Sequence, residues 1–460
     1  MSEQVPVRVG QAYDIEITGL GQSEGVGRVD GFTVFVPGAL PGEQVRARVD
    51  LVKKNYARAG LLEVVRRSPD RVEPSCPHFP ECGGCQLQHL DYQAQLRWKR
   101  QQVADAIQRI GKLTGVEVLP TLGMADPWRY RNKVPFPVGG RGGQLVAGLY
   151  RSGTHDIVDM EGCQIQSGLA DQAFREAKRL SAEHGLIPYD EIKKTGFLRH
   201  ILIREGRQAG ELMCVLVTNG EERTRTSVVA RELMEAVPAV VSVQQNINTR
   251  PTNVIMGPKT ILLGGKATIT DYLGGLAFEI SPLSFFQINP GQAEVLYNQV
   301  LAFCRLTGGE TVFDLYCGIG TISLYLARRA GQVIGIESVP QAVEDARRNA
   351  ERNGIGNVKF HYGEAEKLLP RLARQGARAD VIVLDPPRRG CEPEVLETMA
   401  EMRPERIVYV SCNPATLARD LAVLSERGYR PEVVQPVDMF PHTGHVECII
   451  QIKRAESRMK

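Results

Sequence analysis

The stretch that decides the fold is residues 311–321, which read TVFDLYCGIGT. It begins as an apolar run typical of a buried strand, and Gly318 and Gly320 stand where such a strand would turn into a helix. Glycines at this point allow a ligand to approach the backbone closely. A G-x-G pair alone is weak evidence, but Glu337 ends the next expected strand, where a carboxylate can accept hydrogen bonds from ribose hydroxyls.

Around this turn, helical and strand-like segments alternate with short loops. Helices are predicted at 290–306, 321–329 and 339–354, and strands at 332–337 and 379–387. Such βα repeats predict an α/β domain with a doubly wound, mostly parallel sheet covered on both faces. Ligands of these sheets bind at the carboxyl ends of the strands. We assign residues 281–460 to this domain.

The turn lacks the third glycine of a dinucleotide fingerprint, so a nicotinamide cofactor fits it less well. The layout resembles class I S-adenosylmethionine-dependent methyltransferases, and the resemblance implies that Glu337 holds the ribose of this methyl donor. Glu364 follows the next strand and is similar to the acid that lies near the adenine in those enzymes. Its alternative interpretation is an ordinary surface charge.

Two further motifs end strands of the same sheet. Asp385-Pro-Pro-Arg follows an apolar strand, and its paired prolines fix a rigid turn. A similar turn occurs in methyltransferases that act on exocyclic amines of adenine, which need no cysteine. The second motif is Ser411-Cys-Asn-Pro. A lone cysteine is by default a small buried apolar residue. At a strand end on the ligand edge of the sheet, Cys412 becomes a candidate nucleophile.

Methylation of uracil carbon 5 explains why such a cysteine is needed. Carbon 5 is a poor nucleophile toward a sulfonium, and addition of a thiolate at carbon 6 generates an enolate that can attack the methyl group. A base must then remove the carbon-5 proton before the thiolate can leave. Glu447 follows PHTGHV in the sequence and opens the terminal strand CIIQIK, so it is the best-placed carboxylate.

With these residues identified, the chain resembles the RNA uracil-5-methyltransferase family. The resemblance runs through the whole catalytic half, from DLYCGIGT through DPPRRG and SCNP to HTGHVE, in the family order. It implies Cys412 as nucleophile and Glu447 as proton-abstracting base. It also implies a set of residues around the cofactor, with Thr321 less certain because some members have a polar amide there: Gln287 (in FFQIN), Tyr316, Thr321, Glu337, Glu364 and Asp385.

The first half predicts a nucleic-acid-binding apparatus. Residues 1–67 read as short alternating strands (5–9, 13–20, 32–37, 43–52 and 58–65) typical of a small OB-like β-barrel. Residues 68–280 follow as an α+β region, with a helix near 91–110. A cluster between Arg97 and Lys133, which includes Lys99, holds eight basic and three acidic residues. It can bind RNA or form a solvated helix face. Trp128 and its basic neighbours can likewise stack extruded bases or serve the local fold.

Four cysteines form a candidate metal site: Cys76, Cys82, Cys85 and Cys163. Their C-x5-C-x2-C spacing with one distant partner suits zinc or an iron–sulfur cluster about equally. The triad C-x3-C-x2-C of radical enzymes is absent. The family branch that acts on 23S ribosomal RNA is similar, with an amino-terminal TRAM barrel and a [4Fe-4S] cluster. The resemblance therefore implies that cluster here, in a structural or RNA-positioning role, and 23S rRNA as substrate.

Other function classes remain as alternatives. They are a tRNA uracil-5-methyltransferase, an exocyclic-amine methyltransferase, and a catalytically silent RNA-binding assembly factor, against which the joint presence of Cys412 and Glu447 argues. The net charge is only +3, so RNA binding must use local patches. The sequence has no signal peptide or long uncharged apolar run, which predicts a cytoplasmic protein without membrane contact. No obligate protein partner is evident.

Overall fold

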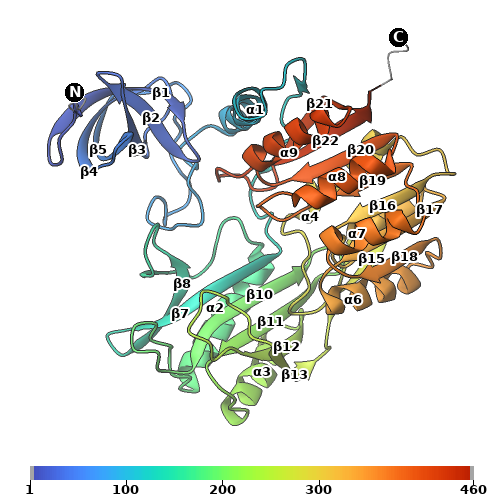
Figure 1. Ribbon diagram of the computed structural model, residues 1–460. Helices are drawn as coiled ribbons and strands as arrows, with labels where there is room; N and C mark the ends of the chain where they lie inside the picture. Colours follow the sequence, from blue (N-terminus) through green and yellow to red (C-terminus); the bar gives the residue numbers. More distant parts are fainter. Residues whose placement is uncertain (1–4, 456–460) are drawn as a thin grey trace.

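The computed structural model describes residues 5–455, which form three lobes (Figure 1). An amino-terminal barrel lies beside helix α1 (Tyr92–Arg109), a central α/β lobe follows, and a larger α/β lobe holds the carboxyl-terminal half. The predicted architecture of a methyltransferase-like α/β domain, an α+β central region and an OB-like barrel is therefore confirmed. The predicted ends at 1 and 460 fall outside the described residues.

The barrel is closed, with strand order β1-β2-β3-β5-β4. Its strands are β1 (Ala12–Leu20), β2 (Glu24–Val29), β3 (Phe32–Pro37), β4 (Gln44–Val52) and β5 (Tyr56–Arg66). The strand predicted at 5–9 is wrong, and β2 takes its place in the barrel. The two glycines of β2 weaken its strand pattern in the sequence, yet the structure needs them there. A Cβ on Gly27 would lie 2.4 Å from the Ile15 side chain of the neighbouring strand.

The central lobe is a seven-stranded sheet with order β13-β12-β11-β10-β7-β8-β9, and two helices cover one face. Its elements are β7 (Lys133–Arg141), β8 (Gln144–Tyr150), β9 (Ile157–Asp159), α2 (Gly168–Glu183), β10 (Leu198–Gly206), β11 (Glu211–Thr218), α3 (Thr224–Ala236), β12 (Val240–Ile247) and β13 (Lys259–Gly265). The opposite face packs on a hairpin, β14 (Ile269–Leu273) and β15 (Leu276–Ile280), which shares its apolar core with the carboxyl-terminal lobe. The two lobes are thus joined by one continuous core.

The carboxyl-terminal lobe contains an eight-stranded sheet with order β18-β17-β16-β19-β20-β22-β21-β6. Its strands are β16 (Thr311–Leu315), β17 (Gln332–Glu337), β18 (Val358–Tyr362), β19 (Val381–Leu384), β20 (Arg406–Ser411), β21 (Tyr429–Val437), β22 (Glu447–Arg454) and the short β6 (Glu117–Val118). β16 to β20 are parallel, whereas β22 runs antiparallel to both β20 and β21. The amino-terminal end of β22 therefore lies at the edge where the parallel strands have their carboxyl ends.

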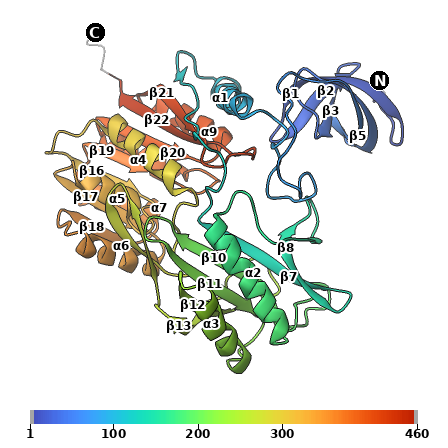
Figure 2. The same ribbon diagram turned by 180° about the vertical axis from the view of Figure 1, so that it is seen from behind.

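Helices cover both faces of this sheet because successive strand residues point to opposite sides. In β16, Val312 enters the core with α4 (Pro290–Cys304), α5 (Thr321–Ala327) and α6 (Pro340–Arg352). Its neighbour Phe313 enters the core with α1 (Tyr92–Arg109), α7 (Ala365–Arg374), α8 (Pro393–Met402) and α9 (Pro414–Glu426). α8 and α9 come forward in Figure 1, whereas α4, on the other face, comes forward in Figure 2.

Two elements that precede the central lobe in sequence pack with the catalytic sheet. α1 contacts α9, and β6 pairs with β21 in parallel. α1 also contacts the barrel, where the Trp98 indole N–H donates to the Leu20 carbonyl at 3.5 Å. α1 therefore bridges the barrel and the catalytic lobe. No helix within residues 5–455 has the length and apolar character needed to cross a membrane.

Candidate active site

Strand register brings the two predicted catalytic side chains together. β20 ends at Ser411, which pairs with Cys448 of antiparallel β22. Cys412 follows Ser411 and Glu447 precedes Cys448, so both leave their strands at the same edge. The next residue, Asn413, caps α9 by accepting the Ala415 backbone N–H at 3.1 Å. Cys412 is thus held in the short turn between a buried strand and a capped helix.

The glycine turn after β16 forms a cradle for a ligand. Gly320 has φ 84°, and a Cβ there would lie 2.8 Å from the Phe360 ring, so glycine is required both for conformation and for space. The Glu337 carboxylate accepts backbone N–H groups from Gly318 at 3.0 Å and from Val339 at 2.8 Å. This carboxylate therefore links the ends of two adjacent strands across the place where a ribose would lie.

The Asp385 turn is fixed from two sides. The Asp385 backbone N–H donates to the Leu315 carbonyl at 3.3 Å, which ties it to the glycine turn. The Arg388 carbonyl accepts the side-chain amide of Asn413 at 3.0 Å and the hydroxyl of Thr416 at 3.3 Å. The turn that carries Asp385 is therefore bound directly to the turn that carries Cys412.

These turns enclose a cleft of about 820 Å³, a size that accommodates a drug-sized ligand with space to spare. Seven of the predicted site residues line it: Gln287, Tyr316, Glu337, Glu364, Asp385, Cys412 and Glu447. Thr321 does not line the cleft. It begins α5, and a hydrogen bond of 3.0 Å joins its hydroxyl to that of Tyr297.

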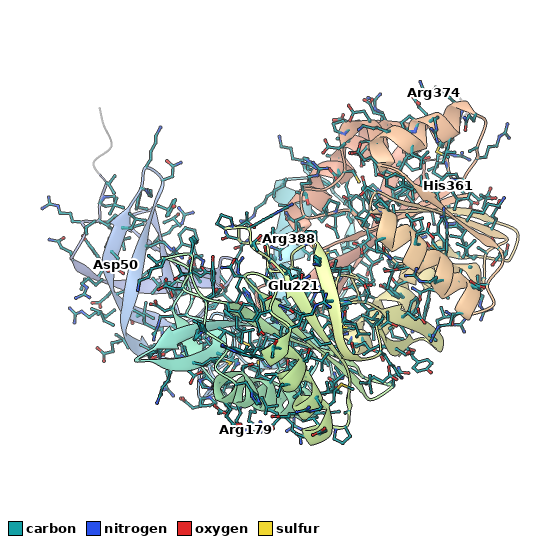
Figure 3. The ribbon with its side chains drawn as sticks, turned by 90° about the horizontal axis from the view of Figure 1, so that it is seen from below. Asp50, Arg179, Glu221, His361, Arg374 and Arg388 are labelled. Atoms are coloured by element: carbon teal, nitrogen blue, oxygen red, sulfur yellow. The ribbon has the colours of Figure 1, made fainter. Side chains whose placement is uncertain are left out.

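The sequence analysis did not assign to the site several other side chains that line the cleft, among them Arg388, Phe440 and His445. All three stand in or beside the motifs DPPRRG and HTGHVE, so their position in these motifs was the available signal. Arg388 lies in the middle of the molecule, between the lobes, whereas Arg374 lies at the outer end of the catalytic lobe (Figure 3). Arg389 also lines the cleft but pairs with Glu392 at 3.0 Å, whereas Arg388 is the cation that acts on the pKa values of Cys412 and Glu447.

Burial, together with neighbouring charges at two of the three groups, raises the pKa values of Asp385, Glu447 and Cys412. Burial raises the pKa of Asp385 to about 7. Burial and the Asp385 charge raise the pKa of Glu447 well above its usual range, against the opposing effect of Arg388. Burial and the two carboxylates raise the pKa of the Cys412 thiol to about 11. Such clustered shifts in a cleft are typical of a reaction centre, and a cationic ligand would relieve them.

The four predicted metal ligands line one small pocket below the barrel, together with apolar neighbours such as Leu149 and Met160. The backbone N–H of Gly84 approaches the Cys82 sulfur at 3.4 Å. Burial raises the pKa of Cys85 to about 11 and of Cys163 to about 12. Across residues 5–455, no group of three or more His, Cys, Asp or Glu side chains is arranged to hold a metal ion.

Comparison with known proteins agrees with this geometry. The family model for tRNA (Uracil-5-)-methyltransferase matches residues 276–455, and the TRAM domain model matches residues 6–62. An uncharacterized RNA methyltransferase of Halalkalibacterium halodurans is 52% identical over 97% of this chain and 98% of its own length. A similar protein of Clostridium acetobutylicum is 46% identical over 99% of this chain and 100% of its own.

Among solved structures, the tRNA (uracil-54, C5)-methyltransferase of Pyrococcus abyssi, in complex with S-adenosyl-L-homocysteine, has 30% identity and a TM-score of 0.77. The similarity covers 96% of this chain and 100% of that one. S-adenosylmethionine is thereby supported as methyl donor and RNA as substrate. By its catalytic-domain match, its full-length relatives and its TRAM barrel, the chain belongs to the RNA uracil-5-methyltransferase family.

Proposed function

We propose that the protein methylates carbon 5 of a uridine through a covalent adduct with Cys412. The observation that carries the proposal is the β20–β22 register, which sets Cys412 and Glu447 at one edge of the cleft that Asp385 and Glu337 also line. The Cys412 thiolate adds to carbon 6 and moves the C5–C6 π electrons to the carbonyl as an enolate. Carbon 5 then takes the methyl group, and S-adenosylhomocysteine leaves.

Glu447 completes the reaction in this proposal. Its carboxylate removes the carbon-5 proton, the electrons of that bond re-form the C5–C6 double bond, and the Cys412 thiolate leaves carbon 6. A raised pKa makes Glu447 a stronger base than an exposed carboxylate. Gln287, Tyr316, Glu337, Glu364 and Asp385 are proposed to hold the methyl donor and the uracil. Thr321 does not line the cleft, so its hydroxyl would influence the bound methyl donor only through its hydrogen bond to Tyr297.

The covalent step is tested with RNA that contains 5-fluorouridine. Fluorine cannot leave carbon 5 as a cation, so the methylated adduct is trapped and shifts the protein on a denaturing gel. We expect a trapped adduct with the wild type and none with Cys412→Ala. Cys214→Ala is the matched control, because Cys214 is buried in β11 of the central sheet, and it should be trapped normally. Trapping by Cys412→Ala would refute the mechanism.

We propose 23S rRNA as the substrate and the four cysteines as ligands of a [4Fe-4S] cluster. The common pocket of the four thiols supports the ligand set, and the TRAM barrel supports an RNA substrate. Four thiols suit zinc as well as an iron–sulfur cluster, and the resemblance to the 23S rRNA branch is the ground for proposing the cluster. Such a cluster would brace the polypeptide around the pocket. Iron and sulfide analysis of anaerobically purified protein, compared with Cys163→Ser, tests it.

A tRNA substrate is the second candidate, and a specific observation favours it. The Pyrococcus abyssi enzyme acts on tRNA, and its similarity to this chain extends over nearly the whole length, barrel included. Labelled methyl transfer to 23S rRNA and to tRNA from a strain that lacks the gene, followed by nucleoside mass spectrometry and mapping, separates the two. Label in 5-methyluridine of tRNA alone would reject the rRNA proposal and keep the chemistry.

A further inference from the structure

Residues 438–446, here called the strap, connect β21 to β22 and lead directly into Glu447. Its members Phe440 and His445 line the cleft. The last rung of the β21–β22 ladder pairs Val437 with Glu447. The residue next to that rung is Asp438, so whatever fixes Asp438 also fixes the backbone from which the Glu447 side chain extends.

A lysine from outside the catalytic sheet holds Asp438. The Lys99 ammonium of α1 donates to the Asp438 carboxylate at 2.6 Å, and both side chains are 0% exposed. Lys99 also donates to the Phe440 carbonyl at 3.1 Å, and the same Asp438 oxygen accepts the Phe440 backbone N–H at 3.2 Å. One buried ion pair thus fixes the first three residues of the strap.

A glutamine one turn earlier in α1 holds the middle of the strap. The Gln95 side-chain oxygen accepts the His442 backbone N–H at 2.9 Å, while its amide nitrogen donates to the carbonyls of Leu87 at 3.0 Å and Leu90 at 2.8 Å. His442 has φ 65°, and its ring stacks on Trp128 with ring centroids 4.0 Å apart. α1 therefore holds the strap at two places, its first three residues and His442.

A fully buried ion pair is a poor way to gain stability alone, because removing two charges from water costs about as much as their attraction returns. We propose that Lys99 and Gln95 are positioning residues for Glu447: they fix the strap so that the carboxyl group faces the carbon-5 proton. This inference rests on the proposed role of Glu447 as base. It also gives Lys99 a function different from the RNA contact that its place in a basic cluster indicates.

The test uses Lys99→Met and the double variant Lys99→Met/Asp438→Leu, which removes both charges and keeps most of the buried volume. The first readout is hydrogen exchange of the amides of residues 438–447. The second is the lifetime of the covalent adduct on uridine-containing RNA. For both variants we expect strap exchange about tenfold faster and adduct release about tenfold slower, with adduct formation unchanged.

Lys193→Met is the control, because Lys193 lies in the central lobe outside the strap and the basic cluster, with its side chain 76% exposed and paired with Asp190. It should match the wild type in both readouts. If Lys99→Met does not fold, the double variant decides. The proposal would be overturned if the strap amides of the double variant exchanged at the wild-type rate. It would also be overturned if they exchanged faster while the covalent adduct was released at the wild-type rate. If the wild type forms no adduct on 5-fluorouridine RNA, the proposed function fails, and exchange alone decides whether Lys99 fixes the strap.

Discussion

The Cys412 thiol is expected to be almost wholly protonated in the free enzyme. Burial and the carboxylates of Glu447 and Asp385 raise its pKa from 9.0 to about 11. At pH 8 a thiol with the ordinary value is about one-tenth ionised, whereas one with a pKa near 11 is about one-thousandth ionised. Since the thiolate is the nucleophile, Cys412 of the free enzyme should react about a hundredfold more slowly than an equally accessible thiol with the ordinary pKa.

The methyl donor should reverse this effect. Its sulfonium carries a positive charge, whereas S-adenosylhomocysteine carries a neutral sulfur at the same atom. A cation in the cleft stabilises the thiolate, so S-adenosylmethionine should lower the pKa of Cys412 and S-adenosylhomocysteine should not. The nucleophile would then be activated chiefly when the donor is bound.

The assay is the pH dependence of Cys412 alkylation by iodoacetamide, followed at the Cys412 peptide by mass spectrometry. The midpoint of this titration is independent of access to the thiol, which changes only the rate. We expect a midpoint near pH 11 for the free enzyme, a higher one for Arg388→Gln, and a lower one for Glu447→Gln. Arg374→Gln, which changes an arginine far from the cleft, is the control (Figure 3). A midpoint below pH 9 in the free enzyme would refute the reasoning.

Three other substitutions test the rest of the site. Gly320→Ala places a Cβ 2.8 Å from Phe360 at φ 84°, so we expect a loss of about 1–3 kcal/mol in unfolding free energy and weaker S-adenosylmethionine binding by calorimetry. Glu337→Gln keeps the size but replaces the acceptor of the Gly318 N–H by an amide; donor affinity should fall about tenfold with unchanged thermal stability, and equal affinity would remove Glu337 from the site. Cys85→Ala should remove iron from the anaerobically purified protein and speed amide hydrogen exchange in the strap. Loss of iron without faster exchange would show that the cysteine site does not influence the strap.

The positions of Cys412 and Glu447 show how far the sequence could lead. Their motifs predicted the residue types, and the apolar terminal strand predicted that Glu447 opens a buried strand. What the sequence could not supply was the insertion of β22 between β20 and β21, antiparallel to both. An apolar run shows that a strand is central but not which neighbours it has. That pairing, and not the motifs, brings the two side chains to one edge.

Lys99 shows the opposite case. A lysine among basic residues on an amphipathic helix indicates a solvated or RNA-binding face, and the neighbouring Arg97 is indeed exposed. Lys99 is instead fully buried against Asp438. That partner lies more than three hundred residues away in sequence. Only tertiary structure brings such a pair together, so no local pattern distinguishes a buried lysine from an exposed one.

The strap that leads to Glu447, the proposed base, also contacts the barrel and the cysteine-rich segment. A Cβ on Gly444 would lie 1.8 Å from the Gln22 carbonyl of the barrel, so the barrel presses directly on the strap. The His442 carbonyl accepts the backbone N–H groups of Gln86 and Leu87, both at 2.9 Å, just after Cys85, one of the proposed cluster ligands. The parts of the chain proposed to bind RNA and metal therefore touch the segment that carries Glu447. In the proposed mechanism, proton abstraction by Glu447 precedes product release, so we expect substitutions at these contacts to slow release of the covalent adduct.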